Sequence, residues 1–321
     1  MAPRRVSAAT TTTGPSSVKG QEQGEGRAGG GQDGSGPSSQ NGRRLAELLD
    51  GWMDIEANID RVAVSTGVTL TFVSVGPPSA VPVLLLHAWG ESHRSFSRLL
   101  PALGDDVRAV AVDLRGHGGA DRPRTGYSLT EVADDVAAFM DAMELPSAVL
   151  LGSSSGGYLA QQVAASQPDR VSGLVLVGSP RDLRGRPSFA DAVDELSDPV
   201  DAGWVRESLT WFPLFQDVPQ WYIDDRVRDG LRIPAHVWRE ALHGLCDAAP
   251  PTETATIACP TLIVWGDRDE LLSRRQQEQL AEAVSGSRLV VYADTGHLVL
   301  WEQPERVARD VTSFLATVPW P

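Results

Sequence analysis

From about residue 60, short apolar runs alternate with longer amphipathic stretches, and this alternation restricts the fold more than any other feature of the sequence. The runs consist largely of Val, Leu, Ile and Ala, which is typical of strands buried on both faces of a mostly parallel sheet. The predicted strands are 81–89, 107–114, 148–152, 172–179, 259–267 and 287–294.

The segments between these strands have helical periodicity, and strands that alternate with helices predict a doubly wound α/β sheet. The run at 68–76 alternates apolar and polar residues instead, so we expect an antiparallel strand at an edge of the sheet. The predicted helices are 92–103, 129–143, 157–167, 274–284 and 305–315.

Two regions depart from this rhythm. Residues 1–42 are rich in Gly, Ser, Thr and Gln and nearly lack large apolar side chains, so we expect a disordered tail. Residues 181–250 contain four of the nine tryptophans, scattered prolines and no buried strand, and we expect them to form a helical cap over one end of the sheet. The α/β core then comprises 43–180 and 251–321.

Charge and composition argue against several classes of function. The net charge of −14 disfavours binding to nucleic acids or anionic membranes, since both require a basic face. No apolar run is long enough to span a bilayer, and Arg4 and Arg5 are not followed by the apolar core of a signal peptide. Cys246 and Cys259 are too few for a disulfide framework, and we expect free thiols in a cytoplasmic protein.

The segment 152–157, Gly-Ser-Ser-Ser-Gly-Gly, lies between a predicted strand and a predicted helix. It matches the G-x-S-x-G pattern, in which a sharp turn presents the middle serine and the glycines permit close backbone approach. The glycine spacing selects Ser154 among the three consecutive serines. Because a serine hydroxyl is a weak nucleophile, a general base must lie beside it.

This base is expected downstream of Ser154. Among the six histidines, His297 is the candidate, since it follows the last predicted strand, where a parallel sheet gathers its functional groups. Asp267 and Asp269 close the preceding strand, and a carboxylate there can orient the imidazole and stabilise its cation.

Together these features resemble the α/β-hydrolase fold family over residues 60–317. The resemblance lies in the Ser…Asp…His order, the serine turn and the segment GHLVLWEQPE (296–305). It implies that Asp269 is the acid, in the pattern Gly-x-x-Asp that ends the acid-bearing strand, with Asp267 as the reserve candidate.

The resemblance also implies an oxyanion hole made by the backbone N–H groups of Trp89 and Ser155. Ala88 stands in this loop where the family usually has glycine, and position 88 therefore has less backbone freedom. His87 is expected to tether the loop, and the segment Asp-Leu-Arg-Gly-His-Gly (113–118) to shape a neighbouring one.

A serine in the turn favours acyl transfer, because epoxide hydrolases and haloalkane dehalogenases of this family have aspartate there. We therefore expect acyl-enzyme hydrolysis of a small to medium apolar ester or lactone, with no metal or organic cofactor. Carbon–carbon bond hydrolysis and perhydrolysis use the same triad and stay open. A small-molecule receptor without turnover is the alternative of another class, and the intact triad weighs against it.

The aromatic residues of the expected cap either line a cavity above Ser154 or only pack the cap, and the sequence does not decide between the two. A small-molecule substrate is the partner that the sequence predicts, and the oligomeric state is left open. The aromatic residues in question are Trp204, Trp211, Phe212, Phe215, Trp221 and Trp238.

Overall fold

The computed structural model describes residues 59–104 and 106–319, and the expected tail at 1–42 lies outside them. Within this part of the chain, eight strands form one sheet in the order β1-β2-β4-β3-β5-β6-β7-β8. β2 pairs antiparallel with β1 and β4, and the remaining neighbours pair parallel, which confirms the mostly parallel α/β sheet. The strands are β1 (Ile59–Ala63), β2 (Thr69–Val75), β3 (Val81–Leu86), β4 (Val107–Asp113), β5 (Ala148–Ser153), β6 (Val171–Val177), β7 (Thr261–Gly266) and β8 (Arg288–Tyr292).

Side chains along the central strands alternate between two apolar layers, because successive residues of a strand face opposite sides. In β5, Leu150 belongs to the layer under α2, α3 and α9, and Leu151 to the layer under α11. Both leucines are fully buried, which explains why such strands are near-continuous apolar runs in the sequence. The bounds of these helices are α2 (Leu129–Ala142), α3 (Ser155–Ser166), α9 (Arg274–Ala283) and α11 (Pro304–Leu315).

Two predictions for the N-terminal half of the fold are wrong. β2 is antiparallel as predicted, but β1 pairs along its outer side and takes the edge of the sheet. The segment 92–103 is not one α-helix; it forms two short 3₁₀ turns, η1 (His93–Phe96) and η2 (Leu100–Ala102). Pro101 lacks an N–H for a helical hydrogen bond, which is one physical reason for the interruption.

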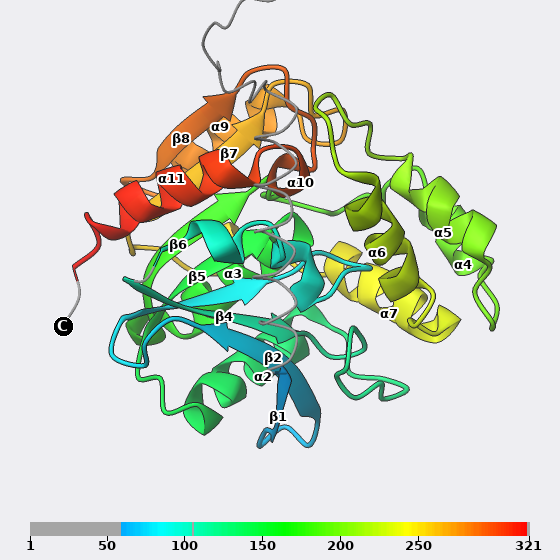
Figure 1. Cartoon of the computed structure of the whole chain (residues 1–321), viewed down its shortest axis with the longest axis horizontal. Helices are drawn as coiled ribbons and strands as arrows, with labels where there is room; N and C mark the ends of the chain where they lie inside the picture. The colour runs from blue at the N-terminus through cyan, green and yellow to red at the C-terminus, as the bar shows by residue number, and fades with distance from the viewer. Residues whose placement is uncertain (1–58, 105, 320–321) are drawn as a thin grey trace, which may run out of the picture. The chain divides into compact units, whose positions relative to one another are not determined.

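The chain between β6 and β7 contains helices and loops but no strand. Side chains from α4 to α7 bury an apolar cluster of their own, and these four helices lie together beside the sheet (Figure 1). They form the predicted helical insertion; its exact limits at 181 and 250 stay a proposal. The four helices are α4 (Ala190–Asp194), α5 (Ala202–Leu209), α6 (Gln220–Gly230) and α7 (Ala235–Cys246), and the short α8 (Pro251–Thr254) follows them before β7.

The two cysteines are unpaired, Cys246 buried and Cys259 partly buried. Burial raises the pKa of both thiols, that of Cys259 to about 11, which keeps them protonated and unreactive at neutral pH. Among residues 59–104 and 106–319, no helix is both long and apolar enough to cross a membrane.

Candidate active site

Ser154 lies in a sharp turn between β5 and α3. Its backbone has φ 48° and ψ −119°, a strained conformation for a residue other than glycine that costs on the order of 1–3 kcal/mol. The Ser154 N–H is donated to the carbonyl of Val177 at 2.8 Å, which holds the turn against β6. A Cβ at Gly156 would lie 2.2 Å from the carbonyl oxygen of Leu86, so only glycine lets α3 begin this close to β3.

The Ser154 hydroxyl contacts His297, which contacts Asp269. The distance from Ser154 Oγ to His297 Nε2 is 2.9 Å, and that from His297 Nδ1 to Asp269 Oδ2 is also 2.9 Å. The side chains of His297 and Asp269 are 3% and 0% exposed. Because a carboxylate only accepts hydrogen bonds, Nδ1 carries the proton and Nε2 is left to accept the serine proton.

Asp269 is itself held in place by the loop that follows it. Its second oxygen, Oδ1, accepts the backbone N–H groups of Leu271 and Leu272, each at 2.9 Å. Asp267 is exposed, and its carboxylate makes no hydrogen bond within the described residues. The structure therefore brings Asp269, and not Asp267, to His297.

The loop at 87–90, called the oxyanion loop below, is fixed by two histidine rings. The Leu114 N–H is donated to Nε2 of His87 at 3.0 Å, and the Gly90 N–H to Nε2 of His117 at 3.3 Å. Both rings must be neutral to accept these protons. Burial lowers the pKa of His87 to about 3 and also lowers the pKa of His117, so both rings are neutral at neutral pH.

The alanine at position 88 causes no backbone distortion in this loop. The left-handed conformation is taken by Gly90, with φ +79°, and Ala88 is not among the described residues with positive φ. A Cβ at Gly90 would lie 2.5 Å from the Trp238 ring, so cap helix α7 packs directly on the loop. The Trp89 indole N–H is also donated to the carbonyl of Trp238, at 3.0 Å.

The two expected oxyanion donors lie close together but are not equally free. The Trp89 N–H is donated to the hydroxyl of Ser155 at 2.7 Å. The Ser155 N–H opens the first turn of α3 and has no acceptor among the described residues, as is usual for a helix N-terminus.

A cavity of about 100 Å³ lies above Ser154 and is lined mostly by apolar side chains. Of the six cap aromatics named from the sequence, Phe212 and Trp238 line this cavity. Phe212 stacks on the ring of His297, with 5.3 Å between ring centroids. Phe189, which sequence reasoning did not single out, and Trp89 also line the cavity.

The other four cap aromatics do not line the cavity. Trp204 packs edge-on against Trp238, and Trp211 stacks on Phe189, with centroids 5.3 Å and 4.7 Å apart, so both support residues of the cavity wall from behind. The remaining two are Phe215, which is 40% exposed, and Trp221, which packs against Tyr222.

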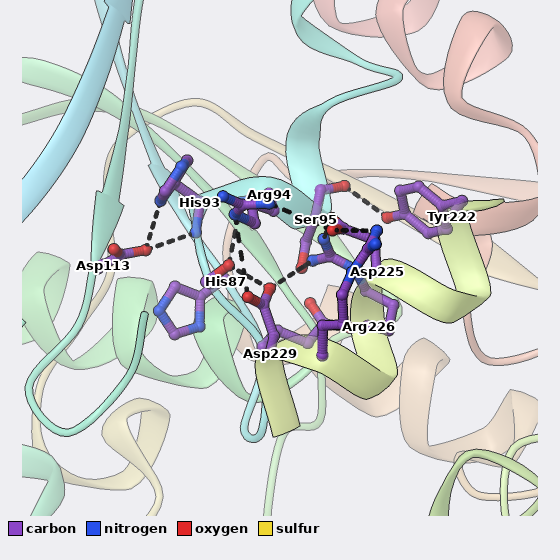
Figure 2. Close-up of polar contacts among 12 residues, drawn as sticks. His87, His93, Arg94, Ser95, Asp113, Tyr222, Asp225, Arg226 and Asp229 are labelled. Atoms are coloured by element: carbon purple, nitrogen blue, oxygen red, sulfur yellow. Dashed lines mark hydrogen bonds and ion pairs between the residues drawn. The ribbon is translucent and has the colours of Figure 1, made fainter. Parts of the chain in front are cut away.

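Polar contacts join cap helix α6 to η1, which follows the oxyanion loop (Figure 2). Tyr222 donates its hydroxyl proton to the carbonyl of Ser95 at 2.7 Å, and Arg226 donates to the Ser95 hydroxyl at 2.8 Å. Arg226 also pairs with Asp225 at 2.6 Å and with Asp229 at 3.3 Å. All three charged side chains are buried, and Arg94 extends the network with a contact of 3.2 Å to Asp225, so the buried charges compensate one another.

Glu302 is a further residue that sequence reasoning left without a role. One carboxylate oxygen accepts the Gly296 N–H at 2.9 Å, and the other accepts the N–H groups of Phe215 and Gln216 at 3.0 and 2.9 Å. It thereby links the residue before His297 to the cap. Burial raises its pKa. An acid that directly follows the apolar run 298–301 is the sequence signal that could have identified it.

Comparisons with known proteins agree on one family. A family model described as the alpha/beta hydrolase fold matches residues 81–304. Over 273 residues the chain is 28% identical to a putative 2-succinyl-6-hydroxy-2,4-cyclohexadiene-1-carboxylate synthase of Bacillus subtilis, which covers 80% of this chain and 98% of that protein.

A second relative is a pimeloyl-[acyl-carrier protein] methyl ester esterase of Neisseria meningitidis. It is 31% identical over 251 residues, which are 74% of this chain and 94% of that protein. The crystal structure of a hydrolase from Pseudomonas aeruginosa is also similar, with a TM-score of 0.72 at 26% identity over 80% of this chain and 98% of the other.

Proposed function

The chain belongs to the α/β-hydrolase fold family, and from that membership we propose that it is a serine hydrolase acting on a small to medium apolar ester or lactone. One observation carries the proposal: Ser154, His297 and Asp269 form a continuous contact with 2.9 Å at each step. This is the arrangement in which an imidazole can take the proton of a serine hydroxyl while a carboxylate stabilises the resulting cation.

In the proposed reaction, Ser154 Oγ attacks the carbonyl carbon of the ester as its proton moves to Nε2 of His297. The carbonyl oxygen becomes an oxyanion next to the oxyanion loop and the first N–H of α3. When the tetrahedral intermediate collapses, the carbon–oxygen bond to the alcohol breaks and His297 gives its proton to the departing oxygen. In a lactone, that oxygen stays attached to the acyl group.

Water then completes the cycle. His297, neutral again, takes a proton from water as the water oxygen attacks the acyl carbon on Ser154. Collapse of this second intermediate returns the proton to Ser154 Oγ and releases the acid. Asp269 keeps the imidazole in one tautomer through both halves of the reaction, since its own position is fixed by two backbone N–H groups.

The cavity supports the substrate class. Its volume of about 100 Å³ suits a short acyl or small ring better than a long chain, and its wall is mostly apolar. Phe212 stacks on one face of the His297 ring and is part of this apolar wall. The proposal includes a cytoplasmic location, supported by the two free cysteines.

The proposal is tested with p-nitrophenyl acetate, butyrate and octanoate and with a small lactone. We expect a burst of p-nitrophenol, faster turnover of the two shorter esters, and background activity for Ser154→Ala at an unchanged unfolding midpoint. A wild-type chain that hydrolyses no ester or lactone and is not labelled at Ser154 by a fluorophosphonate would refute the proposal and favour the receptor alternative. Adding hydrogen peroxide distinguishes perhydrolysis, in which peracid replaces acid as the product.

A further inference from the structure

The residue after the nucleophile, Ser155, has a hydroxyl that the reaction above does not use. Its Oγ accepts the Trp89 N–H at 2.7 Å. It lines the cavity above Ser154, and its own hydroxyl proton is donated to no residue in the described part of the chain. The half-buried Ser155 hydroxyl therefore lies at the oxyanion loop and can still donate one hydrogen bond.

This contact changes how an oxyanion can be bound. The Trp89 N–H reaches a negatively charged oxygen directly only if the Ser155 hydroxyl turns away and breaks its hydrogen bond. If the hydroxyl stays, its proton can be donated to the oxyanion while Oγ still accepts from Trp89. The second arrangement keeps one hydrogen bond and adds a charge-assisted one, which is about twice as strong as a neutral one. It is therefore the favoured arrangement.

We propose that Ser155 is a further catalytic residue of this site, in addition to Ser154, His297 and Asp269, and that its hydroxyl donates to the oxyanion while the Trp89 N–H polarises it. The inference depends on the proposed serine-hydrolase function. In the attack step the carbonyl electron pair moves to oxygen, the Ser154 proton moves to His297, and Ser155 keeps its own proton. The oxyanion then receives two hydrogen bonds from one residue, the N–H and the O–H of Ser155.

A hydroxyl that accepts one hydrogen bond and donates another has a physical advantage over a backbone amide alone. The bond from Trp89 withdraws electron density from Oγ and strengthens the donation to the oxyanion, because linked hydrogen bonds polarise one another. The bond also fixes the side-chain rotamer of Ser155 before substrate arrives, so little reorganisation is needed in the transition state.

The test compares three variants on the same short ester. For Ser155→Ala we expect kcat to fall about 10- to 100-fold with KM nearly unchanged; the loss is smaller than for a lost backbone donor, since the Trp89 N–H becomes available. Ser155→Thr keeps the hydroxyl and should recover most of this loss. Ser153→Ala is the matched control, because Ser153 lies on the other side of the nucleophile, is 7% exposed and does not line the cavity.

A second readout separates catalysis from structure. A trifluoromethyl ketone adds to Ser154 as a hemiketal oxyanion, and its affinity for Ser155→Ala should fall by the same factor as kcat/KM. Equal or faster turnover by Ser155→Ala, with unchanged inhibitor affinity, would overturn the proposal, because the hydroxyl would then only fill the oxyanion position. A wild-type chain without esterase activity would refute the serine-hydrolase function itself, and this inference with it.

Discussion

Replacing Asp269 by asparagine changes one atom of the site and should remove nearly all activity. The Leu271 and Leu272 N–H groups donate to Oδ1 and can only be matched by the asparagine oxygen. The new NH₂ group must then face Nδ1 of His297, which now lies 2.9 Å from Oδ2. Nδ1 becomes an acceptor, the ring proton moves to Nε2, and Nε2 can no longer take the proton of Ser154.

The expected loss in kcat for Asp269→Asn is about 10⁴-fold, which corresponds to about 5.4 kcal/mol of transition-state stabilisation. The assay is the steady-state hydrolysis of a short p-nitrophenyl ester, with the unfolding midpoint measured in parallel. Asp267→Asn is the matched control and should keep wild-type kcat, since that carboxylate is exposed and does not contact His297. An Asp269→Asn enzyme as active as Asp267→Asn would refute the assignment of the acid.

Three further outcomes follow from named contacts. In Glu302→Gln the side chain has a single oxygen, whereas the Gly296 N–H and the N–H groups of Phe215 and Gln216 are donated to different oxygens of Glu302. We therefore expect kcat to fall several-fold and the unfolding free energy to fall by about 1–3 kcal/mol. Wild-type values for both would contradict the role of Glu302. Gly156→Ala places a Cβ 2.2 Å from a backbone carbonyl, and circular dichroism should show loss of folded protein, whereas a native spectrum and midpoint would show that the backbone gives way. His87 has a pKa of about 3 in the folded chain against an ordinary 6.5, so between these values only the unfolded chain binds its proton. The unfolding free energy of the wild type should therefore fall by up to about 1.4 kcal/mol for each pH unit towards acid. Urea titrations at several pH values measure this dependence. If the unfolding free energies of wild type and His87→Gln changed equally with pH, the prediction would be contradicted.

The sheet could be predicted because its burial is encoded locally. The run at 148–152 is apolar at every position before its final glycine, since β5 is covered on both faces, and it reappears as Ala148–Ser153. β1 gave no such signal, because four of its five residues are exposed and only Val62 is partly buried against the core. The strand at 68–76 was therefore predicted at the edge of the sheet, whereas β2 is its second strand.

The candidate triad was predictable for a topological reason. Ser154, Asp269 and His297 each follow a parallel strand, and the ends of such strands meet at one edge of the sheet. Contacts between distant side chains were not predictable in this way. Ser155 and Trp89 are 66 positions apart, and nothing in either segment indicates that the Ser155 hydroxyl accepts the Trp89 N–H.

The cap shows the same limit. The tryptophans at 204 and 238 are both aromatic residues of helices, yet only Trp238 faces the cavity. Which face of each helix covers Ser154 is decided by how α4 to α7 pack on one another and by the buried ion pairs of Arg226, and neither is a property of a single helix.

The most direct test of the central claim is a trapped covalent intermediate. The wild-type chain is mixed with a slowly hydrolysed p-nitrophenyl ester, quenched in acid, digested and mapped by mass spectrometry. We expect one acyl group per chain on Ser154, no adduct on Ser153 or Ser155, and no adduct on the Ser154→Ala chain. An adduct on another residue, or product formation with no acylated Ser154 at any time, would contradict it.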